Sequence, residues 1–545
     1  MDVLLVLHAH LPWVRDPVHP GSIEERWLFE ALWESYLPLL AVADRAAERG
    51  QAGAFTLSLS PTLLAMLGDA RLRAGFTAHL EALLAVARDE IRRSDAARAA
   101  ALEDHVARAE AARARLDEAG GDLAAAFGEH HRFGTIELVT TAATHPVLPA
   151  CRSAGHVAAQ LAVARAALER AAGVAPAGLW LPECAYDPRL DPQLVDAGVG
   201  WTVLDGHGID LATPRSPLGV FAPALTPAGL AVFGREPGAA RRVWSRKHGY
   251  PGDPAYREFH RDLVDEVPHA RLGPLAPPPG ARSPIGLRPY RVTGREVKEL
   301  YDPRAAAERI AAHARDFVEE AERALEGAPR AGDAPPLLVA PYDAELFGHW
   351  WWEGPAFLDQ VLATLHRHPT LQATTPAARL ARHPMLPVVV PAISTWGEGG
   401  HVGVWAAEDT APMLRSIHRA ERAVDAAYAA YAAATTGPSA ASGAGATSGP
   451  AAVARRARHL AARELMLGAA SDWAFLVRTG TNVPYARQRA AEHLDRAVDL
   501  ARRARAPPPD DALHLAAIAS EGPPLAWFPG DVLDAAWGAP RPSSR

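Results

Sequence analysis

Two residue types are scarce in this chain of 545 residues. Cysteine occurs twice, at Cys151 and Cys184. Two thiols cannot supply a disulfide framework or a cysteine-based zinc site, and their scarcity indicates a reducing compartment such as the cytoplasm. Lysine is confined to Lys247 and Lys298, whereas arginine and alanine abound. We attribute that bias to the base composition of the genome and not to function.

The sequence also lacks a surplus of positive charge and a long apolar run. Its net charge of −7 argues against a nucleic-acid surface, which needs a basic stripe, and a neutral sugar polymer suits this balance better. No window approaches the roughly 20 apolar residues of a membrane span. The run "VLLVL" near the N-terminus has no basic region before it, which predicts a buried strand instead of a signal peptide. We expect neither nucleic-acid nor membrane partners.

Short apolar runs alternate with amphipathic segments through the first 400 residues. Several runs are apolar throughout, which is typical of strands that are buried on both faces of a parallel sheet. This alternation predicts a β/α barrel or a doubly wound α/β sheet. The predicted strands are 3–10, 55–60, 136–143, 178–183, 201–205, 336–343 and 386–394.

Three regions depart from this alternation. Residues 68–128 are rich in Ala, Arg and Glu and predict a helical insertion. Residues 206–300 hold many prolines and glycines, which predict long loops over the active site. Residues 401–535 predict a helical C-terminal domain that follows a catalytic region at 1–400. We expect a flexible loop at 437–450 and a disordered tail at 536–545.

Two acidic residues end predicted strands. "GLWLPECAYDP" (178–188) carries Glu183, and "APYDAELFGHWWWEGP" (340–355) carries Asp343. Parallel strands end at one rim of a barrel, so the two carboxyl groups can meet there. Such a pair can cleave a glycosidic bond if one carboxyl is ionised and an apolar wall keeps the other protonated. The alternative interpretation is that each acid caps a strand or pairs with an arginine.

Histidines follow the same predicted strand ends. "HAHLP" (8–12) places His8 and His10 on one face of a strand, and His145 follows another strand. The pattern admits two interpretations and favours neither. The imidazoles can bind a divalent metal, or they can form hydrogen bonds with sugar hydroxyls while neutral.

Tryptophans supply candidate sugar platforms. "STWGEGGHVGVW" (394–405) contains Trp396 and Trp405 with four glycines between them. A structural role, in which the two indoles seal the barrel against the helical domain, is equally consistent with the pattern. "SDWAF" (471–475) suggests an aromatic lip contributed by the helical domain.

These motifs together resemble glycoside hydrolase family 57, and within it the 1,4-α-glucan branching enzymes. The similarity extends over about residues 1–505, and "DAELFGHWWWEG" in order with "WLPECAY" is its most specific part. The other stretches that carry the resemblance are "HAHLPW", "EERWLFEA", "THPVLP", "VWSRKHGYPGDPAYREFHRDL", "STWGEGGHVGVW" and "SDWAFLVRTG".

The resemblance implies a (β/α)7 barrel, an incomplete TIM-type barrel, with a helical insertion and an all-helical C-terminal domain. It implies a retaining glucan transferase that makes α-1,6 branches in glycogen-type synthesis, acts as a monomer or small homo-oligomer, and needs no metal or other cofactor. Glu183 would be the nucleophile and Asp343 the general acid/base. The implied substrate-binding residues are His10, His145, Trp396, Trp405, Asp472, Trp473, Trp350 and Arg235.

The chain also departs from this resemblance. Branching members carry a tyrosine at the tip of a loop that aligns with 214–227, where this chain has no tyrosine and Phe221 is the nearest aromatic residue. Without that hydroxyl, water can compete, which favours an α-glucan hydrolase of amylase type as the alternative. A metal-dependent amidohydrolase and a catalytically inactive glycan-binding protein are further alternatives. Both are weaker.

Overall fold

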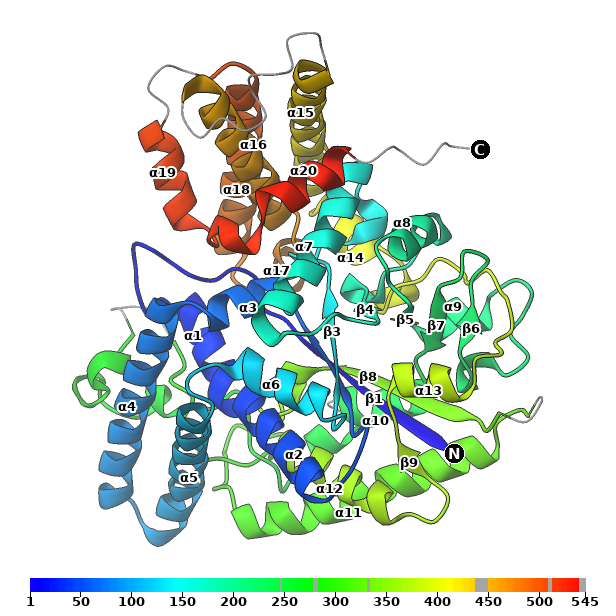
Figure 1. Ribbon diagram of the computed structural model, residues 1–545. Coiled ribbons are helices and arrows are strands. Elements are labelled where there is room, and N and C mark those ends of the chain that lie inside the picture. The colour runs from blue at the N-terminus through cyan, green and yellow to red at the C-terminus, as the bar shows by residue number, and fades with distance from the viewer. Residues whose placement is uncertain (246–247, 278–282, 331–333, 437–448, 508–511, 539–545) are drawn as a thin grey trace.

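A parallel sheet forms the centre of the computed structural model, which describes residues 1–245, 248–277, 283–330, 334–436, 449–507 and 512–538 (Figure 1). Its five main strands follow the order β4-β3-β2-β1-β8, and every neighbouring pair is parallel. The short β9 (Gln372–Ala373) pairs with the start of β1. The five strands are β1 (Asp2–Ala9), β2 (Thr56–Leu59), β3 (Glu137–Thr141), β4 (Leu179–Trp180) and β8 (Leu337–Asp343).

A second group of strands closes the barrel. β5 (Trp201–Leu204) and β7 (Ala231–Gly234) pair in parallel, and β6 (Ala224–Leu225) adds an antiparallel edge to β7. A bridge from Gly178 to Trp201 joins β4 to β5, and the amide of Glu236, just after β7, donates to the carbonyl of Val339 in β8 at 2.9 Å. In the described part of the chain, seven parallel strands therefore surround the core, as the (β/α)7 expectation requires.

The seventh strand differs from the one that the sequence predicts. Residues 386–394 form only isolated bridges, such as Leu225 to Val388, and no named strand. Pro387 and Pro391 lack the amide hydrogens that a sheet ladder needs, so this run stays at the edge. β7 takes its place. β7 lies within 206–300, where the sequence predicts loops, and β6 and the helix α10 (Pro237–Trp244) lie there too.

Helices cover the outside of the barrel, and the long ones such as α11 bury one apolar stripe while α3 is buried along its whole length. A five-residue π-helix, η1 (Leu32–Tyr36), interrupts the first long helix between α1 and α2. The covering helices are α1 (Ile23–Ala31), α2 (Leu37–Glu48), α3 (Pro61–Leu67), α6 (Leu123–Arg132), α7 (Ala154–Ala172), α8 (Asp191–Asp196), α9 (Gly206–Asp210), α11 (Pro303–Glu326), α12 (Gly354–Arg367) and α13 (Pro376–Arg382).

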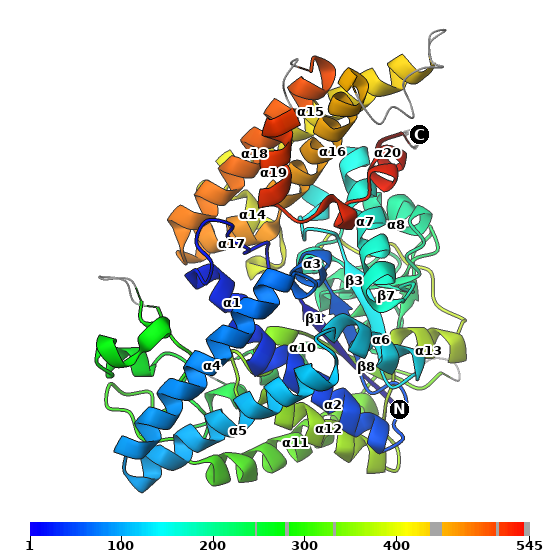
Figure 2. The ribbon, with the colours of Figure 1, turned by 60° about the vertical axis from the view of Figure 1, so that its left-hand side comes forward.

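A pair of long helices occupies the segment in which the sequence predicts a helical insertion. α4 (Ala70–Arg93) and α5 (Ala96–Glu118) pack side by side at one flank of the barrel (Figures 1 and 2). Asp69 caps α4 and Asp95 caps α5, each by accepting a hydrogen bond from a backbone amide of the first turn.

A buried ionic cluster ties the long 206–300 segment to the barrel. Arg288 donates to Glu30 at 3.1 Å and to Glu34 at 3.4 Å, and Arg257 donates to Glu34 at 3.4 Å. Burial alone would raise the pKa of Glu34, but Arg257, His349 and Arg288 outweigh it and lower that pKa to about 2. Glu34 is therefore ionised, and the segment is held by charge as well as by packing.

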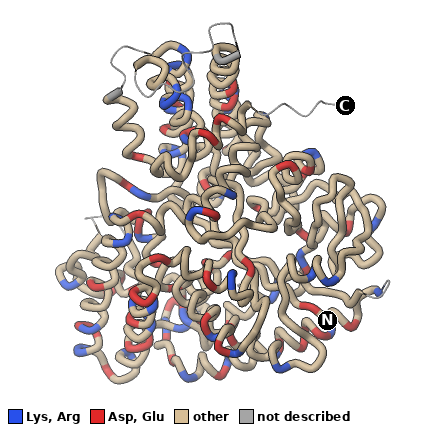
Figure 3. Tube along the Cα trace, viewed as in Figure 1, with Lys and Arg blue, Asp and Glu red and all other residues tan. Residues whose placement is uncertain are grey.

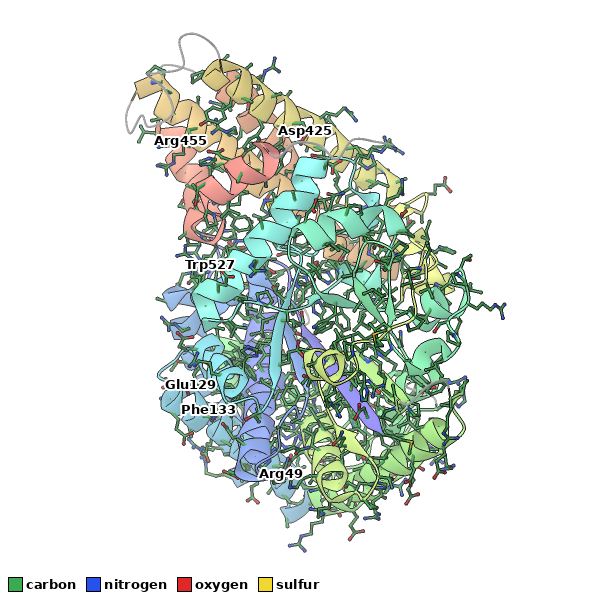
Figure 4. All side chains as sticks on the ribbon, turned by 45° about the vertical axis from the view of Figure 1, so that its right-hand side comes forward. Arg49, Glu129, Phe133, Asp425, Arg455 and Trp527 are labelled. Carbon is green, nitrogen blue, oxygen red and sulfur yellow. The ribbon has the colours of Figure 1, made fainter. Side chains whose placement is uncertain are left out.

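The C-terminal residues form a helical bundle above α7 (Figures 1 and 2). Trp527, labelled in Figure 4, packs against both the barrel core and the bundle core. Asp425 of the bundle, also labelled in Figure 4, accepts hydrogen bonds from Ser153, at the start of α7, and from Trp537. The bundle contains α15 (Ala411–Thr436), α16 (Gly449–Gly468), α17 (Ser471–Thr479), α18 (Val483–Arg505), α19 (Ala512–Glu521) and α20 (Gly530–Gly538), and the short α14 (Gly403–Ala406) precedes it.

Two expected boundaries shift. Residues 536–538, placed by the sequence in a disordered tail, belong to α20, and residues 449–450 belong to α16. The rest of the predicted loop and tail, 437–448 and 539–545, lies outside the described residues.

Charge is distributed without a basic stripe in the view of Figure 3, where arginines alternate with acidic residues along the trace. None of the helices in the described ranges is both long and apolar enough to cross a membrane.

Candidate active site

Strand ends bring the predicted site residues to one rim of the barrel. His8 lies near the end of β1 and pairs in register with Asp343, the last residue of β8. His145 follows β3, and Glu183 follows β4. The carboxyl ends of parallel strands meet at the same rim, so these four side chains converge there.

Glu183 lies in a strained turn that aims its side chain at the site. Its backbone is left-handed, with φ 60° and ψ 20°, and the next residue, Cys184, has φ 46°. Each such non-glycine residue costs about 1–3 kcal/mol, so the surroundings must hold the turn in place. The backbone amide of Trp396 contributes by donating to the carbonyl of Glu183 at 3.1 Å.

Two donors grip the Glu183 carboxylate. The indole Nε1 of Trp396 donates to Oε2 at 2.9 Å, and the hydroxyl of Ser471 donates to Oε1 at 2.8 Å. Burial raises the pKa of Glu183, while these two hydrogen bonds lower it, and the net effect is a raised pKa. Both donors favour the charged form, which is the form that a nucleophile requires.

The pKa of Asp343 is raised as well, and further than that of Glu183. Burial raises the pKa of the Asp343 carboxyl well above the ordinary value, and the carboxylates of Glu345 and Glu183 raise it further against the opposing charge of Arg235. Arg235 is itself paired with Asp205 at 3.2 Å. Among the described residues no arginine forms an ion pair with Glu183 or Asp343, so the arginine-pairing interpretation does not apply.

Sequence reasoning missed Glu345 and Ser471. Glu345 lies in the turn η10 (Ala344–Leu346), and its Oε1 accepts hydrogen bonds from the amide of His10 at 3.1 Å and from the hydroxyl of Tyr36. Glu345 could have been noticed in the sequence, because it is an acid only two residues after Asp343. Ser471 gives no such signal, because it reaches the barrel from the helical bundle.

The histidines form a stacked group beside Glu183. The rings of His10 and His145 lie 4.1 Å apart, and the ring of His8 stacks on Trp180 at 4.8 Å. His10 bonds Asp472 through Nε2 at 3.0 Å and Ser60 through Nδ1 at 2.9 Å.

The hydrogen bonds of the histidines limit which ligand, a metal ion or a sugar, this group can bind. The donor atoms of His10, His145 and Asp472 lie within 4.8 Å of one another, a spacing that can admit a cation. Both ring nitrogens of His145 are engaged, however, with His8 at 3.0 Å and with Ser471 at 2.9 Å. A cation or a sugar hydroxyl that bound a ring nitrogen of His145 would break one of these two bonds, so in this arrangement His145 can meet a ligand only through its ring face or edge.

The structure places some of the other predicted binding residues at the site and buries at least one elsewhere. Trp396 and Arg235 lie at the site, and the Arg235 guanidinium is 5.8 Å from the Trp396 ring centroid. Trp473 is only 1% exposed, donates to the carbonyl of Leu467 and packs in a core of the helical region. This placement corrects the expectation of an aromatic lip, because apolar neighbours from the bundle cover the indole.

Two further tryptophans and Phe221 differ in how far they are buried. Trp405 is nearly buried and packs with Val147 and Ala185, which favours its sealing role. Trp350 is 55% exposed and contacts Phe259, with ring centroids 4.6 Å apart. Phe221 ends the turn η5 (Gly219–Phe221) and is half-buried against the core.

Two family profiles match the chain. Glycosyl hydrolase family 57 matches residues 4–390, and the profile described as 1,4-alpha-glucan branching enzyme, C-terminal, matches residues 440–527. The chain is 32% identical over 549 residues to a probable 1,4-alpha-glucan branching enzyme of Mycobacterium tuberculosis, with 94% of each chain covered. It is 29% identical over 525 residues to a 1,4-alpha-glucan branching enzyme of Thermococcus kodakarensis, covering 90% of this chain and 71% of that one.

Solved structures resemble the whole fold. An alpha-amylase from Thermotoga maritima superposes with a TM-score of 0.85 at 30% identity and covers 98% of this chain and 99% of its own. A family 57 branching enzyme from Pyrococcus horikoshii gives 0.82 at 27% identity, covering 100% and 98%. With a profile match over most of the barrel and these full-length likenesses, the chain belongs to glycosyl hydrolase family 57.

Proposed function

We propose that this protein is a 1,4-α-glucan branching enzyme. The observation that carries the proposal is the unequal setting of the two acids. Glu183 is gripped by two hydrogen-bond donors, whereas burial and two carboxylates raise the pKa of Asp343. The relatives named as branching enzymes, and the C-terminal profile of that name, support the choice of reaction.

In the proposed first step Glu183 acts as the nucleophile. A carboxylate oxygen of Glu183 attacks the anomeric carbon of an α-1,4-linked glucose, and the bond to the departing O4 breaks. Asp343, protonated because its pKa is raised, gives its proton to O4. The result is a covalent glycosyl-enzyme and a shortened glucan chain.

The second step transfers the chain. Asp343, now a carboxylate, removes the proton from a 6-hydroxyl of an acceptor glucan, whose O6 attacks the anomeric carbon and releases Glu183. Two inversions give overall retention, and the product carries an α-1,6 branch. Neither step uses a metal. His10, His145 and Asp472 are proposed to contact the sugar, and Trp396 also serves the nucleophile.

A hydrolase of amylase type is the second candidate. Phe221 stands where branching relatives are expected to carry a tyrosine, and the similar solved structures include the alpha-amylase from Thermotoga maritima. Without a phenol hydroxyl over the site, water can reach the glycosyl-enzyme before an acceptor does. The two candidates share the first step and differ in the second.

Product analysis on amylose separates them. We expect α-1,6 linkages, released as new chains by a debranching enzyme, to exceed the new reducing ends. Reducing ends that accumulate without branches would exclude branching and leave the hydrolase. The Glu183→Gln variant is the inactive control, with a loss of about 10⁴-fold or more and an unchanged melting temperature.

We further propose an α-glucan polymer as the partner, a role in glycogen-type synthesis and a cytoplasmic location. The first two rest on the named relatives, and the last rests on the low cysteine content. A monomer or small homo-oligomer remains our expectation, which sedimentation of the purified protein would check.

A further inference from the structure

A continuous file of hydrogen bonds leads from the barrel interior to Glu183. Ser58 bonds Nδ1 of His8 at 3.1 Å, and Nε2 of His8 bonds Nε2 of His145 at 3.0 Å. Nδ1 of His145 bonds the hydroxyl oxygen of Ser471 at 2.9 Å, and Ser471 bonds Glu183 at 2.8 Å. Ser58, His8, His145 and Ser471 are all buried.

Counting donors and acceptors fixes the direction of every hydrogen bond in this file. An ionised Glu183 can only accept, so the single O–H of Ser471 points to it, and the Ser471 oxygen must accept from Nδ1–H of His145. Burial lowers the pKa of His145 well below its ordinary value, so its ring is neutral and Nε2 is an acceptor. We assign the tautomer from these bonds.

The same count continues inward. Burial also lowers the pKa of His8, so this ring is neutral as well. It must donate from Nε2 to His145 and therefore accepts at Nδ1 from the Ser58 hydroxyl. The donor or acceptor role of each group in the file therefore fixes the role of the next one. The Ser471 hydroxyl, at the end of the file, donates to Glu183.

We propose that Ser471 and His8 are positioning residues, which hold the Glu183 carboxylate in its charged, attacking orientation through one neutral file of hydrogen bonds. The inference deepens the proposed function, because it concerns the nucleophile of that reaction, and it rests on that function. Ser471 acts directly. His8 acts from two side chains away by fixing the tautomer of His145.

Loss of the His8 donor has a specific consequence. Without His8, the proton of His145 can move to Nε2, and Nδ1 becomes an acceptor. The Ser471 hydroxyl then turns towards His145, and Glu183 loses a donor although none of its own contacts has been replaced. The other titratable groups that face Glu183 stay in place, namely Asp343, Asp472, His10, His145 and Cys184.

The pH profile of kcat/KM for α-1,4 cleavage tests this coupling. A missing donor disfavours the charged form of Glu183, so activity on the acid limb should appear at higher pH. We expect Ser471→Ala to lower kcat/KM about tenfold on that limb, with little change in KM. His8→Phe keeps the ring that stacks on Trp180 and should give a similar loss.

The double variant shows whether Ser471 and His8 act through the same file of hydrogen bonds or independently of each other. With Ser471→Ala there is no hydroxyl left to turn, so adding His8→Phe should cause little further loss. Losses that multiply to about a hundredfold would overturn the proposal. Ser471→Thr, which retains the hydroxyl, should restore the acid limb if the file is correct.

Two controls remove comparable groups outside the file. Ser394 is buried and its hydroxyl has no hydrogen-bond partner among the described residues, so Ser394→Ala should leave the acid limb unchanged. His79 is a buried histidine against Phe29 whose Nε2 has no partner in the described part of the chain, so His79→Phe should do the same. A shift in either control equal to that of the site variants would also overturn the proposal.

A second readout does not depend on activity. The ¹⁵N chemical shifts of the histidine rings should show His145 neutral with its proton on Nδ1 at neutral pH, and His8→Phe should move that proton to Nε2. A wild-type His145 that is charged, or protonated on Nε2, would overturn the file even if the variants fold poorly. A protein that cleaves amylose without branching would refute the proposed function and leave both readouts intact.

Discussion

Ser471 of the helical bundle donates a hydrogen bond to Glu183 at the barrel rim, across 288 residues of sequence. The bond begins at the first residue of α17 and ends in the strained turn after β4. The candidate active site is therefore completed by two parts of the chain. The bundle packs on α7 through a shared apolar core, and its helix α17 brings both Ser471 and Asp472 to the barrel rim.

The indole of Trp396 should act on the nucleophile as well as on sugar. Trp396→Phe keeps an aromatic ring but removes the Nε1 donor to Glu183, so we expect kcat to fall by about tenfold to a hundredfold with KM nearly unchanged. Trp396→Ala should in addition raise KM, because stacking area is lost. Steady-state kinetics on amylose would measure both effects.

Trp244 provides the matched control for this pair. It contacts the Trp396 ring, and within the described ranges its own buried Nε1 has no hydrogen-bond partner. Trp244→Phe should therefore leave kcat close to the wild-type value. A Trp396→Phe enzyme as fast as this control would show that the indole hydrogen bond does not assist Glu183.

Neutralising Asp343 should stabilise the fold at neutral pH. Its pKa is raised well above 3.8 in the folded protein, so folding favours the protonated form. Below the pKa of Asp343 in the unfolded chain, the carboxyl is protonated in both states and does not reduce the free energy of unfolding. As the pH rises through the higher pKa of the folded protein, the buried carboxyl ionises and stability is lost. Asp343→Asn should raise the melting temperature at pH 7 and have little effect near pH 3. An equal or lower melting temperature at pH 7 would contradict the assigned pKa direction.

The ionic cluster around Arg288 should matter for stability. Arg288→Met leaves the carboxylates of Glu30 and Glu34 short of a partner inside the protein, and we expect a loss of about 3–5 kcal/mol in the free energy of unfolding. Arg291→Met breaks an exposed pair with Glu299 and should cost less than about 1 kcal/mol. Urea titration of both variants would test the difference.

The same cluster has a pH signature. The pKa of Glu34 is lowered to about 2 from 4.5, so its contribution to stability is present above 4.5 and is lost as the pH falls through 2. Arg288→Met should weaken this acid dependence, because one of the charges that lower the pKa is gone. An unchanged slope of stability against pH below 4.5 would count against the charge assignment.

The pattern of short, mostly apolar runs predicts most of the barrel because its strands are buried on both faces. The sequence locates β1, β2, β3, β5 and β8 within a few residues. It misplaces the seventh strand, since the valines of 386–394 have high β-propensity while their flanking prolines remove ladder hydrogen bonds. β7 is a four-residue strand, and its short apolar run is overlooked because the surrounding segment is rich in proline and glycine.

The sequence singles out candidate site residues most readily where a polar side chain follows a strand. Glu183 and Asp343 are visible because each ends an apolar run. Ser471 is hidden, because its role depends on how the bundle packs on the barrel. Trp473 shows the converse error, since an aromatic residue beside a functional one can belong to the core.

In the proposed reaction Glu183 carries the sugar chain between the two steps. The most direct test is to trap that intermediate. In an Asp343→Ala enzyme, α-maltosyl fluoride can react without acid assistance because fluoride leaves readily, but no base remains to activate an acceptor. Mass spectrometry of the digested protein should then find one maltosyl unit on the peptide that contains Glu183. A maltosyl unit on another residue, or a product of inverted configuration without any adduct, would contradict the account.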